Sequence, residues 1–341
     1  PGFAPLDRSP ATHPFTAGLL RREPAPPLGI LRIGLFDAFA YPQHCAAEWE
    51  SFRAELAATG TCDERCRAQF AERLEAALLG RLATQLDELA AAGATALLLD
   101  LTGNGGGNDI VGPMTRMMTP RPIPARSSGF IRHPHSVARL AAVAADLRAD
   151  LARPDLTPRQ RDLVSAALAR AEVAERDAAT PCDLSSLWSL DAGEPLPCEN
   201  TGRLEPLFPD VTPTELAGLA SLGHLGGSDS AARTGVWRGE LFVLVDRRTA
   251  SASEDFAASL ADAGAARLVG ERTMGVGCGY TNGGVTLELP ATGLTVRAPD
   301  CVRFRADGRN EAAGLEPDLP VAWSDDDDAR TRAAKALAPL R

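Results

Sequence analysis

Short apolar runs bounded by polar residues predict the strands of this chain. Consecutive apolar positions indicate strands that are buried on both faces, whereas strict alternation indicates strands with one polar face. A loop from Pro290 to Gly293 separates two alternating segments, which predicts a hairpin. The buried runs cover 28–36, 95–101, 241–245 and 266–270, and the alternating segments cover 285–289 and 294–298.

Helical periodicity fills much of the chain between these strands. A helix between two apolar runs predicts parallel strands joined by a right-handed crossover. Pro154 interrupts two Ala- and Arg-rich amphipathic segments, so these predict an antiparallel helical hairpin. The predicted helices cover 46–58, 63–92, 109–118, 136–151, 157–176 and 255–263, and a last helix follows the acidic run 325–328.

Composition narrows the class of protein. The 341 residues are 45% hydrophobic and 23% charged, which is typical of a folded globular chain. The formal net charge of −10 argues against a nucleic-acid partner, which favours a basic face. No apolar run approaches the length of a membrane span. The first residue is not Met, so we expect a processed or truncated product without its export signal.

Seven cysteines favour an oxidising compartment, with up to three disulfides and one odd thiol. Three pairings are plausible from spacing: Cys62 with Cys66, Cys182 with Cys198, and Cys278 with Cys301. A zinc site at Cys62-x-x-x-Cys66 is the rival interpretation, but no second paired cluster has metal-ligand spacing. We therefore expect a secreted or periplasmic protein.

The run 241–245 is followed, after three polar residues, by Thr249-Ala-Ser251-Ala-Ser253, which comes directly before a predicted helix. A serine at a strand-to-helix turn lies beside the free N–H groups of the helix's first turn, which can stabilise an oxyanion. The simpler interpretation is that these hydroxyl residues only cap the helix.

A second turn supports the catalytic interpretation. The run 95–101 ends in Thr102-Gly-Asn-Gly-Gly-Gly107. Consecutive glycines leave backbone N–H groups accessible to a carbonyl or an anion. The spacing is not that of a nucleotide-binding P-loop. Two strand-end turns, one with accessible amides and one with a serine, suit an acyl-transfer site.

Four motifs in order resemble the tail-specific (C-terminal processing) proteases, the S41 serine peptidases. They are Asp100-Leu-Thr-Gly-Asn-Gly-Gly-Gly107, Val245-Asp-Arg-Arg-Thr-Ala-Ser-Ala-Ser-Glu254, Gly270-Glu-Arg-Thr-Met-Gly275 and Gly314-Leu-Glu-Pro-Asp318, and the resemblance covers about residues 29–112 and 236–323. It implies an α/β fold with a ClpP/crotonase-like core and a polypeptide substrate, without a metal or organic cofactor. It places the nucleophile on Ser251 and the oxyanion hole on the amides of Ala252 and of Gly106 or Gly107.

The chain departs from the lysine-dependent branch of this family. Val276 occupies the position of that branch's basic lysine, and the single lysine, Lys335, is far from every motif in the sequence. The chain is more similar to the tricorn-like branch, which uses serine, histidine and glutamate. That resemblance puts Glu311, three residues before Gly314, in the role of the glutamate.

Five histidines are candidates for the base: His13, His44, His133, His135 and His224. We take His44 first, because it follows the first core strand. A base contributed by an upstream part of the protein is the other interpretation.

The resemblance also suggests a division of the chain. We expect an irregular lead-in over 1–28, a core over 29–112 and 236–325, a cysteine-containing helical insertion or lid over 113–235, and a C-terminal helix over 326–341. The insertion serves either as a lid over the cleft or as the face of a homo-oligomer.

Two further functions remain open. The chain lacks the lysine that serves as the base of the catalytic serine in the lysine-dependent branch. In one alternative it is therefore a catalytically inactive S41-like protein that binds peptides or small apolar ligands. A crotonase-type acyl-CoA enzyme would keep the oxyanion glycines but would need no nucleophilic serine. We expect a serine endopeptidase, because Ser251, the glycine turn and Glu311 occur together.

Overall fold

In the computed structural model the chain forms two compact units. The structure describes all residues except 1–2, 7–8, 10–11, 23, 25, 57–61, 109, 184–200, 210, 226–232, 281–284 and 341. The first unit comprises Pro1–Ile123, Ser230–Gly275 and Ala313–Arg341, and the second comprises Pro124–Asp229 and Val276–Ala312. No described helix combines the length and the apolarity that a membrane span requires.

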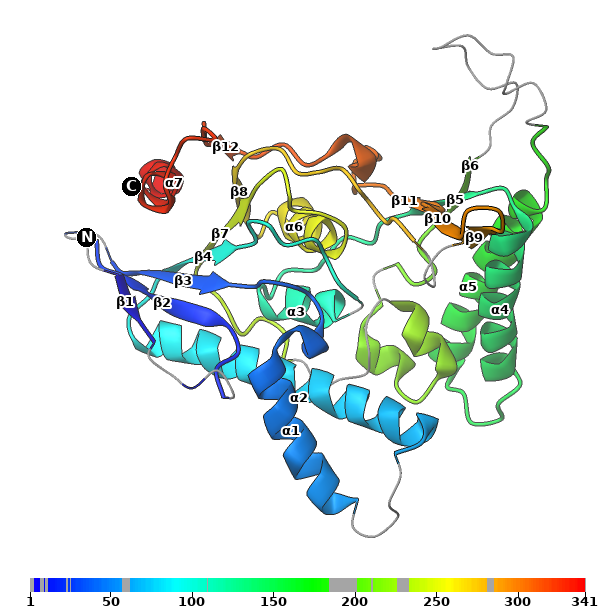
Figure 1. Ribbon diagram of the computed structural model, residues 1–341. Coiled ribbons are helices and arrows are strands. Elements are labelled where there is room, and N and C mark those ends of the chain that lie inside the picture. The colour runs from blue at the N-terminus through cyan, green and yellow to red at the C-terminus, as the bar shows by residue number, and fades with distance from the viewer. Residues whose placement is uncertain are drawn as a thin grey trace. The chain divides into compact units, whose positions relative to one another are not determined.

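A seven-stranded sheet forms the centre of the first unit (Figure 1). Its order is β1-β2-β3-β4-β7-β8-β12; β1, β2 and β3 pair antiparallel, and the strands from β3 to β12 pair parallel. The strands are β1 (Phe3–Pro5), β2 (Thr16–Leu20), β3 (Leu28–Arg32), β4 (Ala96–Asp100), β7 (Glu240–Val245), β8 (Arg267–Gly270) and β12 (Leu319–Pro320).

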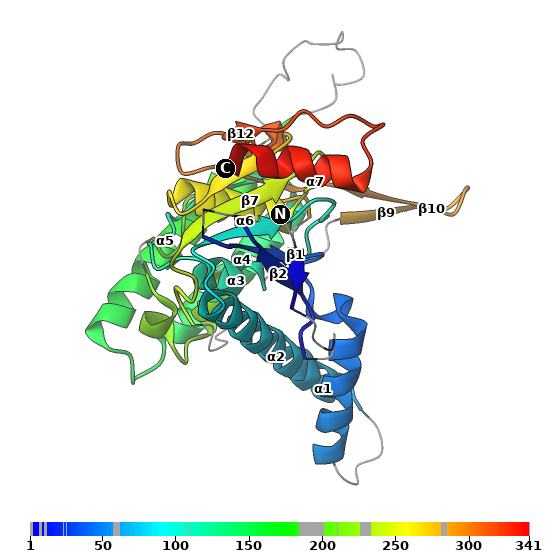
Figure 2. The same ribbon diagram turned by 90° about the vertical axis from the view of Figure 1, so that its left-hand side faces the viewer.

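Helices cover both faces of this sheet, α7 on one and α2, α3 and α6 on the other (Figure 2). Strand β7 is continuously apolar because both of its faces are buried. Val243 and Val245 pack toward α6, whereas Phe242 and Leu244 pack toward α7. The helices of this unit are η1 (Ala38–Ala40), α1 (Pro42–Glu55), α2 (Glu64–Ala91), α3 (Val111–Met117), α6 (Ala252–Asp262), α7 (Ala329–Leu337) and η7 (Ala338–Leu340).

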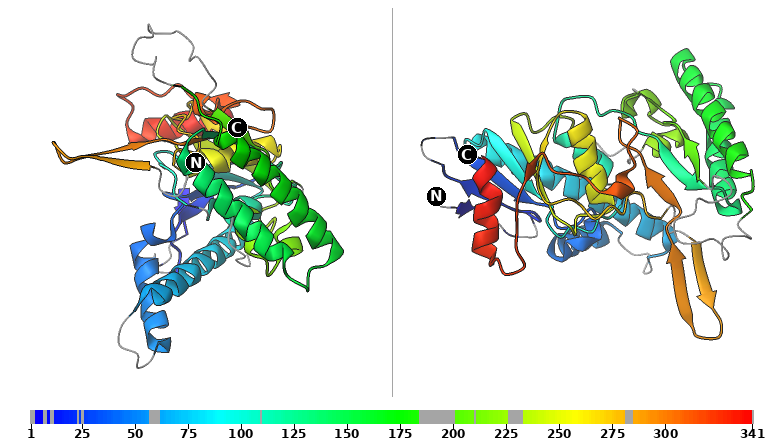
Figure 3. Two further views of the ribbon diagram at one scale, coloured as in Figure 1. Left: turned by 90° about the vertical axis from the view of Figure 1, so that its right-hand side faces the viewer. Right: turned by 90° about the horizontal axis from the view of Figure 1, so that it is seen from above.

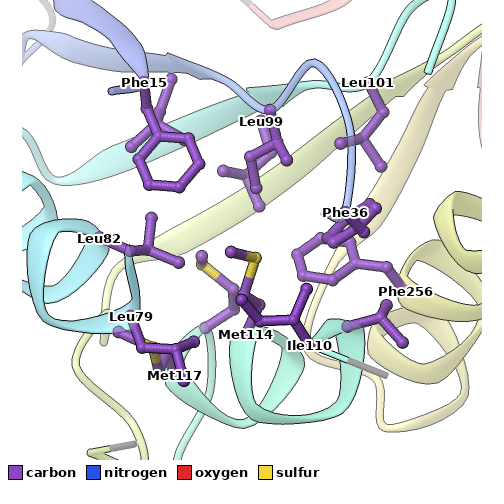
Figure 4. Packing of buried hydrophobic residues seen from close by; sticks show 14 of the residues in the cluster. Phe15, Phe36, Leu79, Leu82, Leu99, Leu101, Ile110, Met114, Met117 and Phe256 are labelled. Carbon is purple, nitrogen blue, oxygen red and sulfur yellow. The ribbon is translucent and has the colours of Figure 1, made fainter. Parts of the chain in front are cut away.

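The larger apolar cluster lies between the sheet and α2, α3 and α6 (Figure 4). Phe36 packs against Phe256 of α6 with ring centroids 5.0 Å apart, and both rings are fully buried. Met114 and Met117 of α3 fill the space beneath β4. Because Phe36 and Phe256 flank the two strand-end turns, this cluster fixes the backbone on which the candidate site is built.

The second unit contains a helical hairpin and two small sheets (Figure 3). Helices α4 (Pro134–Leu151) and α5 (Pro158–Ala178) pack through small alanines around Leu147 and Val164. The sheets join β5 (Ser128–Ile131), β6 (Thr201–Leu204) and β11 (Cys301–Arg303) in the order β11-β5-β6, and β9 (Val285–Leu289) with β10 (Leu294–Ala298). The 3₁₀ helices are η3 (Pro213–Leu216), η4 (Ala220–Leu225) and η6 (Glu311–Ala313).

The mixed α/β class is confirmed, and the closer assignment to a ClpP/crotonase-like core stays a prediction. The helices and buried strands lie within a few residues of their predicted ranges, and the 285–289 and 294–298 hairpin has the predicted bounds. The α6 helix begins at Ala252 rather than at 255, because Ser251 is its N-cap.

The structure divides the chain differently from the prediction in two places. Residues expected to be an irregular lead-in contribute β1 and β2 to the large sheet; β1 has only three residues, too few to show a period. Residues 276–312, expected in the core, belong to the second unit, because β11 pairs with β5.

The disulfides Cys62–Cys66 and Cys278–Cys301 are confirmed, and Cys45 is a free thiol whose pKa is raised by burial. Cys198, the predicted partner of Cys182, lies outside the described residues.

Candidate active site

The glycine turn and the serine turn lie at the same edge of the sheet, because β4 and β7 are parallel neighbours. Four hydrogen bonds join them; one runs from Thr249 Oγ1 to the Leu101 carbonyl at 3.1 Å, and three have backbone N–H donors. Leu101 N–H donates to the Leu244 carbonyl at 2.9 Å, Gly103 N–H to Oδ1 of Asp246 at 2.9 Å, and Ala250 N–H to the Asn104 carbonyl at 3.0 Å. The structure therefore brings together the two turns that the sequence analysis paired.

Ser251 has a strained backbone. Its φ is 56° and its ψ is −120°, and it is the one non-glycine residue with positive φ in the part of the chain that the structure describes. Such a conformation costs about 1–3 kcal/mol and persists only where the surroundings impose it. A serine on a sharp strand-to-helix turn presents its Oγ at the edge of the sheet, as nucleophilic serines do in hydrolases.

Gly106 lies directly against this serine. A Cβ built on Gly106 would come within 2.7 Å of the Ser251 Cβ and 2.9 Å of the Ala252 nitrogen. Its φ of 112° also disfavours any residue with a side chain. The close contact of the two turns therefore requires glycine at this position.

The two predicted glycine donors differ in their hydrogen bonds. Gly106 N–H already donates to Oδ1 of Asn104 at 2.9 Å. Gly107 forms a parallel bridge with Phe36, in which Phe36 N–H donates to Gly106 and Asn108 N–H donates to Phe36. In such a bridge Gly107, which lies between the two bonded residues, directs its own N–H away from Phe36. Gly107 is also exposed, so its amide is the better candidate for the oxyanion donor.

Ala252 is the first residue of α6 and is buried. The first N–H groups of a helix have no acceptor within the helix, so they can donate to a bound oxyanion. Ala252 thus matches the geometry expected of the second donor, and its part in catalysis stays a prediction.

Glu254 is a buried carboxylate at the centre of the site, and the sequence analysis assigned it no role. It is 0% exposed. Its Oε2 accepts from Ser251 N–H at 3.0 Å, and its Oε1 accepts from Thr273 Oγ1 at 2.6 Å and from Gly275 N–H at 2.7 Å. The Ser-x-x-Glu spacing of a capping box was the sequence signal that could have identified it.

Thr273 extends this network to the last motif. Its Oγ1 accepts from Leu315 N–H at 2.8 Å and donates to Glu254. The segments 270–275 and 314–318, which the resemblance singled out, therefore converge on the carboxylate that holds the serine turn.

His44 is fully buried in the first turn of α1. Three other histidines face carboxylates: His13 lies 3.2 Å from Glu88, His135 2.9 Å from Asp300, and His224 3.1 Å from Asp146. Nδ1 of His133 accepts from the backbone N–H of His135. The assignment of His44 as the base stays a prediction.

Glu311 belongs to the second unit, where it is 1% exposed. Its Oε1 accepts from Arg126 Nη1 at 2.5 Å and its Oε2 from Arg303 Nε at 2.8 Å. The two guanidiniums compensate the buried charge. Each carboxylate oxygen has a second lone pair, so a further donor such as an imidazole N–H is compatible with these bonds. The predicted role of Glu311 remains untested by this geometry.

Lys335 is engaged elsewhere. Its Nζ lies 2.6 Å from Oδ2 of Asp327, and it sits on α7, which packs on the face of the sheet opposite to α6. That the chain uses no serine–lysine dyad stays a prediction.

Residues 202–321 match the model of peptidase family S41, a segment that contains Ser251, Glu254 and Glu311. A search of curated protein sequences gave no match.

Three solved structures share the fold. Mature CPAF complexed with lactacystin is 14% identical, with a TM-score of 0.57 over 96% of this chain and 53% of that chain. Mature CPAF is 17% identical, with a TM-score of 0.51 over 90% and 49%, and a CPAF point mutant is 16% identical, with a TM-score of 0.50 over 96% and 53%.

This chain therefore spans about half the length of these solved proteins. Its fold is theirs, and the segment with the strained serine matches the family. Residues 202–321 are therefore similar in sequence to peptidase family S41, and the chain shares its fold with the CPAF structures.

Proposed function

We propose that the chain is a serine peptidase in which Ser251 attacks the carbonyl carbon of a peptide bond. The observation that carries this proposal is the strained Ser251 at the start of α6, held against the glycine turn. The similarity of residues 202–321 to a peptidase family supports a polypeptide substrate. The two confirmed disulfides support an oxidising, extracytoplasmic compartment.

In the proposed reaction the Ser251 Oγ forms a bond to the carbonyl carbon, and its proton passes to a base. The carbonyl oxygen becomes an oxyanion, which the amides of Gly107 and Ala252 stabilise. Collapse of this intermediate breaks the peptide C–N bond, and the departing amine takes the proton from the base. Water then hydrolyses the acyl-enzyme, which restores the serine. We assign the base to His44, because it follows the first core strand, and the orientation of the imidazole to Glu311, the role that the tricorn-like resemblance implies for the glutamate.

A substrate strand fits the crotonase-like core that we propose. An extended peptide can add to a sheet edge by main-chain hydrogen bonds, which gives affinity without strict sequence preference. The catalytic mechanism asks for no metal or organic cofactor, since the oxyanion hole and the base carry the chemistry.

Labelling with a fluorophosphonate, followed by peptide mass mapping, tests the nucleophile. We expect an adduct on Ser251 that Ser251→Ala abolishes. Ser253→Ala is the matched control, because Ser253 lies two residues away and is 0% exposed. A folded protein that takes no adduct would favour the inactive ligand-binding alternative, and an adduct on a different residue would refute the assignment of Ser251.

The base is tested by the same label. We expect His44→Gln to slow the labelling rate by about a hundredfold or more, since a general base contributes on the order of 10² to 10⁴. His13→Gln, His135→Gln and His224→Gln are the comparison set, because these histidines already face carboxylates. A larger loss in one of them would transfer the role to that histidine.

A further inference from the structure

The first unit has a cavity of about 420 Å³ that the peptidase proposal does not use. Three segments line it: 118–121, which follows α3; 237–241, which leads into β7; and 264–267, which joins α6 to β8. A volume of this size accommodates a small organic molecule.

The cavity lies at the opposite end of the sheet from the candidate active site. Glu240, a lining residue, is the first residue of β7, whereas Ser251 follows the last residue of that strand. A strand of six residues is about 20 Å long. A ligand in the cavity would therefore not touch the serine, and the inference is independent of the proposed peptidase activity.

Three arginines border the cavity: Arg121, Arg238 and Arg267. Arg121 Nη1 donates to the Gly264 carbonyl at 2.7 Å, which fixes its guanidinium at the wall. The side chains of Arg238 and Arg267 are exposed and make no ion pair within the residues that the structure describes. With Glu240 as the one lining acid, the formal charge of the cavity is three minus one, or +2, in a chain of net charge −10.

Three apolar residues form the floor of the cavity. Met118, Trp237 and Leu241 line it and are each only 2% exposed, so they present little surface to a ligand. The indole N–H of Trp237 is already satisfied, because it donates to the Glu240 carbonyl at 3.2 Å. The positive charge that a ligand can reach therefore comes mainly from the exposed Arg238 and Arg267.

A basic cavity selects a particular ligand chemistry. Guanidinium groups recognise carboxylate and phosphate by paired N–H donors. We propose that this cavity is a binding site for a small molecule that carries a phosphate or carboxylate group, held by Arg238 and Arg267.

Calorimetric titration with two probes, pyrophosphate and citrate, tests the site at low ionic strength. We expect saturable binding of at least one probe at one site per chain. The double variant Arg238→Gln/Arg267→Gln should weaken that binding by about tenfold or more, because it removes the two guanidiniums that would bind the anionic group. Preference for pyrophosphate would identify a phosphate site, and preference for citrate a carboxylate site.

A charge-matched control is available in Arg65→Gln/Arg330→Gln, which removes two exposed arginines outside the cavity lining. We expect this variant to bind like the wild type. The absence of saturable binding by both probes would overturn the proposal, and so would an equal loss in the two double variants, because that result would show only a general charge effect. Thermal melting of each variant checks that it is folded.

Discussion

The backbone N–H of Ser251 donates to the carboxylate of Glu254 at 3.0 Å, and Glu254 is wholly buried. This bond joins the strained residue of the site to a group that also binds Thr273 and Gly275. A backbone conformation that costs about 1–3 kcal/mol needs such a partner. Glu254 therefore acts as a positioning residue for the serine turn.

Glu254→Ala is expected to destabilise the fold and to stop the labelling of Ser251. The substitution leaves one buried and two partly buried donors without their acceptor, and a buried donor left unpaired costs about 1–3 kcal/mol. We expect the free energy of unfolding to fall by roughly 3 kcal/mol or more, measured by urea denaturation.

Glu288→Ala is the control for that experiment, because Glu288 is an exposed acid on the β9 strand. It should change the free energy of unfolding by less than about 0.5 kcal/mol. If Glu254→Ala were as stable as this control and still labelled at the wild-type rate, Glu254 would have no positioning role.

Gly106→Ala should abolish labelling, because the new methyl group would lie 2.7 Å from the Ser251 Cβ. The neighbouring Gly105 gives a matched control: a Cβ there would meet no atom within 4 Å, and its φ is not in the positive range. Gly105→Ala should therefore label at the wild-type rate. Equal labelling by the two variants would contradict the close packing of the turns.

Sequence patterns predicted the parts of this site that depend on local structure. Ser251 and the glycine turn were predictable because each follows a continuous apolar strand, and parallel neighbours end at the same edge. Glu254 was missed because its partners Thr273 and Gly275 lie about twenty positions further along the chain. Such contacts depend on how the loops return to the helix, which no local period encodes.

The histidines also make contacts that local sequence patterns cannot predict. His13 meets Glu88, and His135 meets Asp300, at sequence separations of 75 and 165 residues. Periodicity places each of these residues on an element, but only the folded chain pairs them. The lead-in strands β1 and β2 were missed for a related reason, since they are three and five residues long and depend on pairing, β1 with β2 and β2 with β3.

Removing the Cys278–Cys301 disulfide should destabilise the second unit more than removing Cys62–Cys66 destabilises the first. The sequence separations are 23 and 4 residues, and the loop-entropy estimate gives about 3 and about 2 kcal/mol respectively. Thermal unfolding of Cys278→Ser/Cys301→Ser and Cys62→Ser/Cys66→Ser compares them. A larger loss in the second variant would mean that strain or contacts, rather than loop length, set the contribution.

Tyr41 should make the stability of the first unit sensitive to alkaline pH. Burial raises the pKa of its phenol to about 12, against the opposing effect of hydrogen bonding to Leu35. Because the folded pKa lies above the unfolded value of about 10, the contribution is complete below pH 10 and is lost between pH 10 and 12. Each unit of pKa difference corresponds to 1.36 kcal/mol, so the loss of stability is roughly 2–3 kcal/mol.

Tyr41→Phe lacks the ionisable group, so the stability difference between wild type and variant should shrink by that amount between pH 10 and 12 in urea denaturation. Tyr280→Phe, at an exposed tyrosine, should follow the wild-type curve, and a Tyr41→Phe curve parallel to the wild type would show that the phenol does not ionise on unfolding as described.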